Sequence, residues 1–227
     1  MLKYFLVGET HGTNEAPEAC WNILKKHKTP NLALEFSCEY QKEVDAFLKN
    51  KMGIDELSIF DVEGSHDGRA SPAIKRLMLK ARKNKIKIFF VDSDRGHIHQ
   101  RENEMTKNLM KIKGKLVYLC GDGHASKKEI HLSRVFIIIF RVIRLFNSKY
   151  PKFERVITTC GSLLPERETE SYKVVSLHGG KFYNFKIKNA GKCKIDKKFD
   201  SFPVIVPSQT KRYNFLYVVE KFSASKL

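Results

Sequence analysis

The chain has 227 residues, and its 42 lysines and arginines outnumber its 25 aspartates and glutamates, which gives a formal net charge of +17. A hydrophobic content of 42% and an aromatic content of 11% exclude a disordered chain and are enough for a substantial core. The positive charge suggests an anionic partner such as nucleic acid or lipid headgroups, but a well-solvated lysine-rich surface explains it more simply.

Cysteine usage and the amino terminus indicate a protein of a reducing compartment. The five cysteines contain no Cys-x-x-Cys pair and are odd in number, which argues against a disulfide framework or a zinc knuckle. Gly8 and Glu9 come too early for a signal-peptide apolar core. We therefore expect a cytoplasmic chain with no signal peptide and no transmembrane segment.

The first two-thirds of the chain alternates short apolar runs with helical patterns, which predicts a mostly parallel sheet covered by helices on both faces. The predicted strands are Lys3–Val7, Leu32–Phe36, Ile86–Val91, Leu116–Cys120 and Arg155–Cys160. The predicted helices are Glu15–Lys26, Glu39–Lys51, Ser71–Asn84 and Ile98–Ile112. A further segment, Arg134–Phe146, is predicted to be a helix buried against the sheet, with a helix in a membrane interface as the alternative.

The last third changes character. Two β-type runs flank Gly179-Gly180, which predicts a hairpin, and the runs "FPVIV" and "YNFLYVVE" follow. We interpret residues 1–165 as an α/β domain of catalytic type. Residues 166–227 then form a basic, antiparallel β extension that could pack on the same sheet.

Polar residues follow several of the predicted strands, where a parallel sheet binds its ligands. The first strand ends in "VGETH" and the fourth in "CGDGH", so each is followed by a Gly-x-x-His sequence that brings His11 and His124 to one edge. Glu35 stands within the apolar run "NLALEFS", where an ionised carboxylate needs a partner. Asp92 and Asp94 follow the third strand. We expect these side chains to meet in one cleft.

Five stretches, in their order and spacing, resemble the erythromycin-esterase/ChaN-like/Tiki–TraB superfamily over about residues 1–165. They are "VGETHGTNE", the strand-end Glu35, "DGRAS" (67–71), "QRENEM" (100–105) and "LCGDGHAS". The superfamily includes an antibiotic-lactone esterase, haem-associated iron-uptake proteins and membrane-tethered metal-dependent proteases. No membrane anchor or secretion signal accompanies these motifs, which argues against the last two groups. The basic tail has no counterpart in the superfamily that we can assign.

The resemblance implies five catalytic residues: Glu9, His11, Glu35, Arg101 and His124. It places Arg69 less securely, and we assign Arg69, Asp92 and Asp94 to substrate binding. In a metal-free hydrolase, His11 held by Glu9 or Glu35 acts as general base, while Arg101 and His124 bind an anion or oxyanion. In a metallohydrolase, His11 and His124, with Glu35, Glu9 or both, hold one divalent ion that activates water, and this donor set suits zinc, manganese or iron.

Three functions follow from these residues. The first is a hydrolase of an ester, amide or peptide bond, acting on a small molecule or a peptide. The second is a protein that binds haem, a metal or an anion without turnover. The third is a basic module that binds nucleic acid or lipid headgroups through its tail.

Overall fold

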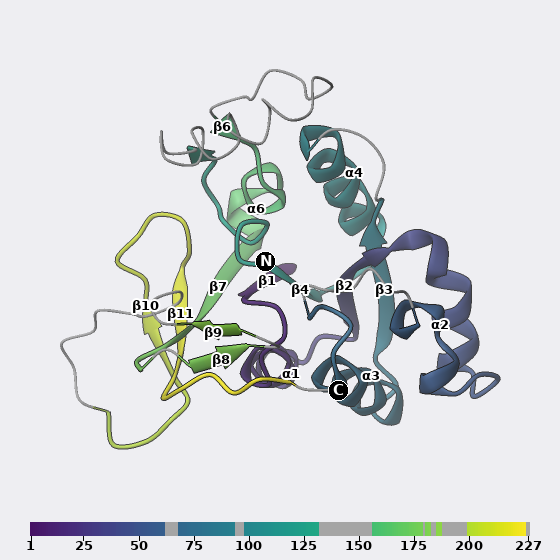
Figure 1. Ribbon diagram of the computed structural model, residues 1–227. Coiled ribbons are helices and arrows are strands. Elements are labelled where there is room, and N and C mark those ends of the chain that lie inside the picture. Colours follow the sequence, from purple (N-terminus) through teal and green to yellow (C-terminus); the bar gives the residue numbers. More distant parts are fainter. Residues whose placement is uncertain are drawn as a thin grey trace, which may run out of the picture.

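The computed structural model describes residues 1–61, 68–93, 98–131, 156–178, 180–182, 185–187 and 199–225. Its centre is a seven-stranded sheet in the order β10-β11-β7-β1-β4-β2-β3 (Figure 1). Every neighbouring pair in this sheet is parallel except β10 with β11. The predicted fold class, a mostly parallel α/β sheet with a C-terminal antiparallel extension, is confirmed, with β10 and β11 as the antiparallel pair.

The sheet is built from seven strands whose bounds follow. They are β1 (Tyr4–Glu9), β2 (Asn31–Ser37), β3 (Lys87–Asp92), β4 (Leu116–Gly121), β7 (Thr169–Ser176), β10 (Val204–Pro207) and β11 (Phe215–Val219). The helices are α1 (Glu15–His27), α2 (Gln41–Leu48), α3 (Pro72–Lys83), α4 (Ile98–Lys111) and the one-turn α6 (Cys160–Leu163). Two small antiparallel pairs join β5 (Ile130–His131) to β6 (Val156–Ile157), and β8 (Gly180–Phe182) to β9 (Phe185–Ile187).

Side chains of β1 alternate between two hydrophobic cores. Phe5 and Val7 pack on the face that α1, α2 and α3 cover, whereas Tyr4 and Leu6 pack on the face of α4 and α6 (Figure 1). All six residues of β1 are buried as a result. Burial on both faces explains why the central strands are continuous apolar runs in the sequence. Among the described residues, no helix is long and apolar enough to cross a membrane.

Two predicted elements are wrong. Of the described residues in the Arg155–Cys160 run, only Val156 and Ile157 form a strand, which pairs with β5 outside the main sheet, and Cys160 begins α6. The hairpin at Gly179-Gly180 does not form from its two predicted runs, because β7 already pairs with β1 on one edge and β11 on the other. β8 pairs with β9 instead. The predicted helix Arg134–Phe146 lies outside the described residues.

The C-terminal segment Phe222–Ser225, here called the C-terminal strap, crosses the loop that follows β1. Ala224 forms an antiparallel bridge with Thr13, and the Ser225 amide donates to the carbonyl of Gly12 at 2.9 Å. The hydroxyl of Ser225 accepts from the amide of Ala73, in the first turn of α3, at 2.9 Å. The strap thereby links the start of α3 to the loop between β1 and α1.

Candidate active site

The sheet order brings four strand ends together. β1, β4, β2 and β3 are consecutive neighbours, and their carboxyl ends carry Glu9, Gly121, Glu35 and Asp92. The four parallel ends therefore form one edge, as expected for a ligand site in an open α/β sheet. A Cβ atom at Gly121 would lie 3.3 Å from Nε2 of His11 and 3.6 Å from a Glu35 carboxylate oxygen, so glycine leaves room at the centre of this edge.

Glu9 orients His11. Nδ1 of His11 lies 2.7 Å from Oε1 of Glu9, and because a carboxylate only accepts, Nδ1 carries the proton. Nε2 then faces the site, 4.0 Å from Oε2 of Glu35. Burial acts to lower the pKa of His11, but the hydrogen bond and the charge of Glu9 outweigh it, so the pKa is raised above its ordinary 6.5. Nε2 is the basic atom of neutral His11.

Glu35 is the anchor of the site and is almost fully buried. Its Oε1 accepts from Arg101 at 2.9 Å and lies 3.1 Å from Nε2 of His124 and 3.2 Å from Nη1 of Arg69. Its Oε2 accepts from the amide of Gly121 at 2.7 Å. Burial acts to raise the pKa of Glu35, but His124 and the nearby cations hold it well below its usual range. Glu35 is therefore a permanent anion.

A register irregularity between Leu34 and Ser37 explains how Glu35 reaches these partners. The pairing of β2 with β4 ends at Leu34, and the pairing with β3 shifts before Ser37. Such irregularities re-aim side chains near sites.

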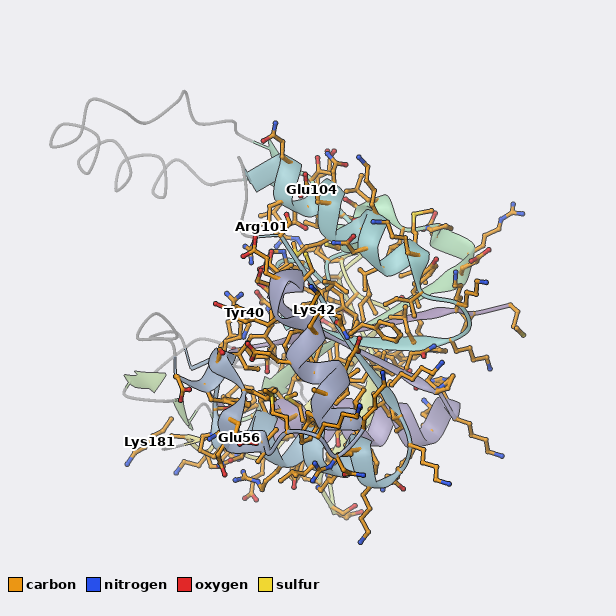
Figure 2. The ribbon with its side chains drawn as sticks, turned by 90° about the vertical axis from the view of Figure 1, so that its right-hand side faces the viewer. Tyr40, Lys42, Glu56, Arg101, Glu104 and Lys181 are labelled. Carbon is orange, nitrogen blue, oxygen red and sulfur yellow. The ribbon has the colours of Figure 1, made fainter. Side chains whose placement is uncertain are left out.

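Asp92 forms ion pairs with the two arginines of the site. Arg101, at the start of α4 (Figure 2), donates from Nε to Oδ1 of Asp92 at 2.8 Å, and its Nη2 contacts Oδ2. Nη1 of Arg69 lies 3.6 Å from Oδ2 of Asp92. Because Asp92 has no exposed surface and is occupied by Arg101, the geometry gives it an arginine-positioning role. Its predicted contact with substrate stays a prediction.

Behind His124 lies a carboxylate that sequence reasoning missed. Nδ1 of His124 lies 2.5 Å from Oε1 of Glu102, while Nε2 faces Glu35, so both ring nitrogens meet carboxylate acceptors and both carry protons. Burial acts to lower the pKa of His124, but hydrogen bonds to Glu102 and Glu35 raise it to about 10. At neutral pH His124 is a fixed cation.

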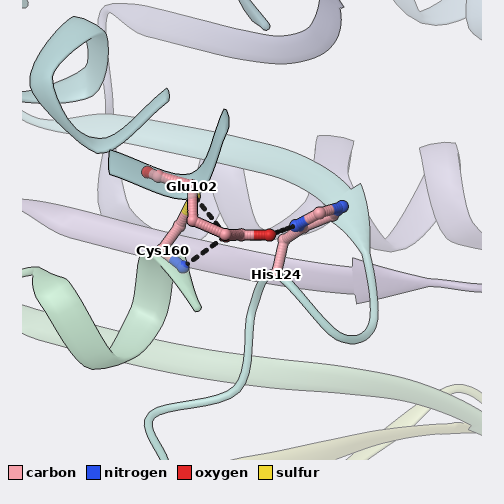
Figure 3. Close-up of side chains that lie close together, drawn as sticks. All are labelled: Glu102, His124 and Cys160. Atoms are coloured by element: carbon pink, nitrogen blue, oxygen red, sulfur yellow. Dashed lines mark hydrogen bonds and ion pairs between the residues drawn. The ribbon is translucent and has the colours of Figure 1, made fainter. Parts of the chain in front are cut away.

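Cys160 completes this group (Figure 3). The other oxygen of Glu102, Oε2, accepts from the amide of Cys160 at 2.8 Å and from its thiol at 3.1 Å. Burial and Glu102 raise the pKa of the thiol. Glu102, His124 and Cys160 each offer a ligand atom, and these atoms lie within 4.8 Å of one another, so this group could hold a metal ion. The predicted set of His11, Glu35 and His124 is not such a group in the part of the chain that the structure describes, and stays a prediction.

The charged groups form two layers. The carboxylates of Glu9, Glu35, Asp92 and Glu102 are at most 5% exposed, whereas the side chains of Arg69, Arg101, His11 and His124 are 16–24% exposed. A ligand entering the site would therefore contact the N–H donors first, with the carboxylates buried behind them. With four carboxylates, two arginines and a charged His124, protonation of His11 brings the cluster to neutrality, which favours its raised pKa.

The C-terminal extension also contacts the site. Lys173 of β7 pairs with Asp122 at 2.5 Å, and the hydroxyl of Tyr213 donates to the Asp122 carbonyl at 2.8 Å. Asp122 lies in the loop that carries His124, so the extension supports this loop. Of the remaining candidates, Asp94 lies outside the described residues.

No family model and no curated protein sequence matches the chain. In structure it is similar to a succinoglycan biosynthesis protein, with a TM-score of 0.64 and 10% identity over 99% of this chain and 89% of the other. A Bacillus cereus protein gives a TM-score of 0.60 and 11% identity over 99% and 90%. ChaN of Campylobacter jejuni, described with cofacially bound haem, gives 0.49 and 11% over 97% and 88%. The first two likenesses support the α/β fold. Identities this low concern the fold alone.

Proposed function

We propose that the chain is a hydrolase that cleaves an ester, amide or peptide bond with water activated by His11. The observation that carries the proposal is the different hydrogen bonding of the two histidines: one ring nitrogen of His11 meets a carboxylate at hydrogen-bond distance, whereas both ring nitrogens of His124 do. Glu9 leaves Nε2 of His11 as a basic atom facing the site. His124, between Glu35 and Glu102, is held as a cation. One exchangeable base beside fixed donors is the arrangement that acyl transfer to water needs.

The reaction begins when Nε2 of His11 takes a proton from water, whose oxygen attacks the carbonyl carbon of the substrate. Glu9 stabilises the imidazolium that forms and keeps its ring in place. When the tetrahedral intermediate collapses, the bond to the leaving group breaks, and Nε2 of His11 returns its proton to that group.

Negative charge on the carbonyl oxygen is stabilised by the cationic layer. Among the described residues, Arg101 contacts Glu35 and Asp92 through Nε and Nη2, which leaves the two N–H groups of Nη1 for the substrate. Asp92 and Glu35 hold the guanidinium in place before substrate arrives, so no reorganisation is needed in the transition state. A small-molecule or peptide substrate with an exposed carbonyl fits this role, and an anionic surface bound through the basic tail stays a prediction.

A panel of ester, amide and peptide substrates tests the proposal with two matched variants. His11→Gln removes the base, and turnover should fall by on the order of 10²–10⁴. The control His178→Gln changes an exposed histidine after β7 and should leave turnover unchanged. Full activity in folded His11→Gln would contradict the proposed base. Saturable anion binding by the wild-type protein without turnover on any substrate would favour the binding function.

A further inference from the structure

We propose that Glu102, His124 and Cys160 form a binding site that takes one divalent metal ion and prefers zinc to other divalent ions. The site lies at the buried side of the His124 ring. This inference shares His124 with the proposed hydrolase function, because the ion would take the place of the proton on Nδ1, but its test does not depend on turnover. It uses Nδ1 of His124, on the side of the ring that faces away from Glu35. The three donors come from α4, the loop after β4 and the start of α6, which converge in the interior (Figure 3).

The donor atoms suit zinc. One sulfur, one imidazole nitrogen and one carboxylate oxygen are ligands that Zn²⁺ accepts, whereas Mg²⁺, Ca²⁺ and Mn²⁺ prefer all-oxygen or oxygen-rich sets. Bond lengths of about 2.0–2.3 Å to a tetrahedral zinc ion place its ligand atoms roughly 3.3–3.6 Å apart. The pairs in the structure are Nδ1–Oε1 at 2.5 Å and Sγ–Oε2 at 3.1 Å, and no pair exceeds 4.8 Å. The two short distances use different oxygens of Glu102, and the Nδ1–Oε1 pair would have to open by about 1 Å to admit the ion.

The surroundings of the three residues also fit. Nε2 of His124 faces Oε1 of Glu35 at 3.1 Å, and a metal-bound histidine almost always donates its second ring N–H to a carboxylate or carbonyl in this way. The hydroxyl of Thr106, one helical turn after Glu102, is bonded to the Glu102 carbonyl at 2.8 Å and holds this part of α4 in place.

The charge of the interior is conserved when the ion binds. Cys160 and Glu102 are almost completely buried, so an unbalanced ion would be costly there. A divalent ion replaces one proton on the Cys160 thiol and one on Nδ1 of His124. Two positive charges enter as two leave, so the net charge of the interior stays the same.

Cobalt(II), which replaces zinc in sites of this type, tests the proposal without reference to activity. The full chain is titrated with Co²⁺ after removal of bound metal, and thiolate-to-cobalt charge-transfer absorption is recorded. We expect a saturable band at one Co²⁺ per chain, which added Zn²⁺ abolishes. The matched variants are Cys160→Ser, which removes the proposed ligand, and Cys38→Ser, which removes an exposed thiol.

The band should be absent in Cys160→Ser and unchanged in Cys38→Ser. A folded wild-type chain without a saturable band would overturn the proposal, as would a band that survives Cys160→Ser or disappears with Cys38→Ser. If Cys160→Ser does not fold, Glu102→Gln tests the metal site instead. It should raise the Co²⁺ concentration for half-saturation by at least about tenfold, and an unchanged midpoint would overturn the site.

Discussion

Replacing Glu35 by glutamine should destabilise the protein strongly. Oε1 of Glu35 faces three cationic donors, from Arg69, Arg101 and His124, while Oε2 accepts from the amide of Gly121. The NH₂ group of glutamine would therefore meet a donor in either orientation. Removing one member of a buried ion network costs about 3–5 kcal/mol, and the lower end applies here because the two arginines are 24% exposed.

Chemical denaturation at pH 7 measures the loss against a matched control. Glu104→Gln makes the same change at an exposed position of α4 (Figure 2) and should alter the free energy of unfolding by no more than about 0.5 kcal/mol. The pKa of Glu35 is lowered in the folded chain, so its contribution is present above 4.5 and is lost as the pH falls toward the folded pKa. The difference between variant and wild type should shrink in acid. A Glu35→Gln chain as stable as Glu104→Gln at pH 7 would refute this reasoning.

Two further predictions concern His124 and the C-terminal strap. The pKa of His124 is raised from 6.5 to about 10, so its contribution to stability is complete below pH 6.5 and is lost as the pH rises toward 10. The loss in the free energy of unfolding should reach about 5 kcal/mol. Unfolding curves over this pH range should show the loss in wild type and not in His124→Gln. An equal slope in both chains would contradict it. Removing residues 223–227 should speed amide hydrogen exchange in the loop Gly12–Asn14, which the C-terminal strap contacts, by at least about tenfold. Removing residues 226–227 alone should leave this exchange unchanged. Equal protection of the loop in both truncated chains would show that the C-terminal strap does not hold it in place.

Strand-end reasoning predicted which side chains meet at this edge of the sheet. Glu9, His11, Glu35 and His124 are joined by distances of 2.7, 4.0 and 3.1 Å, because each follows or ends a strand of the same parallel sheet. Arg101 was named as a site residue from the family resemblance, and in the structure it lies against Glu35. The parallel order of strands fixes which ends meet, so short motifs far apart in sequence could be assembled without coordinates.

Glu102 and Cys160 were missed for different physical reasons. Glu102 lies within a helical pattern, where a glutamate is usually solvated; the available signal was that it shares the buried face of α4 with Met105 and Leu109. Cys160 ends an apolar run that resembled a strand, and periodicity alone does not distinguish a short buried strand from the approach to a helix.

The parallel placement of the C-terminal strands was also missed. β7 inserts beside β1 although it follows β4 by a long connection, and β11 is parallel to β7. Alternation of apolar residues predicts that a strand forms, but it does not say which edge of a sheet the strand will join.

Titration of the two site histidines, followed by NMR of ring nitrogens in histidine-labelled protein, tests the division of roles between them most directly. His11→Gln and His124→Gln assign the signals. Wild-type His124 should remain doubly protonated through neutral pH and lose its proton only near pH 10, while His11 should titrate above 6.5 but before His124, with its proton retained on Nδ1. A neutral His124 at pH 7, or a His11 that titrates after it, would contradict the assignment of His11 as the base.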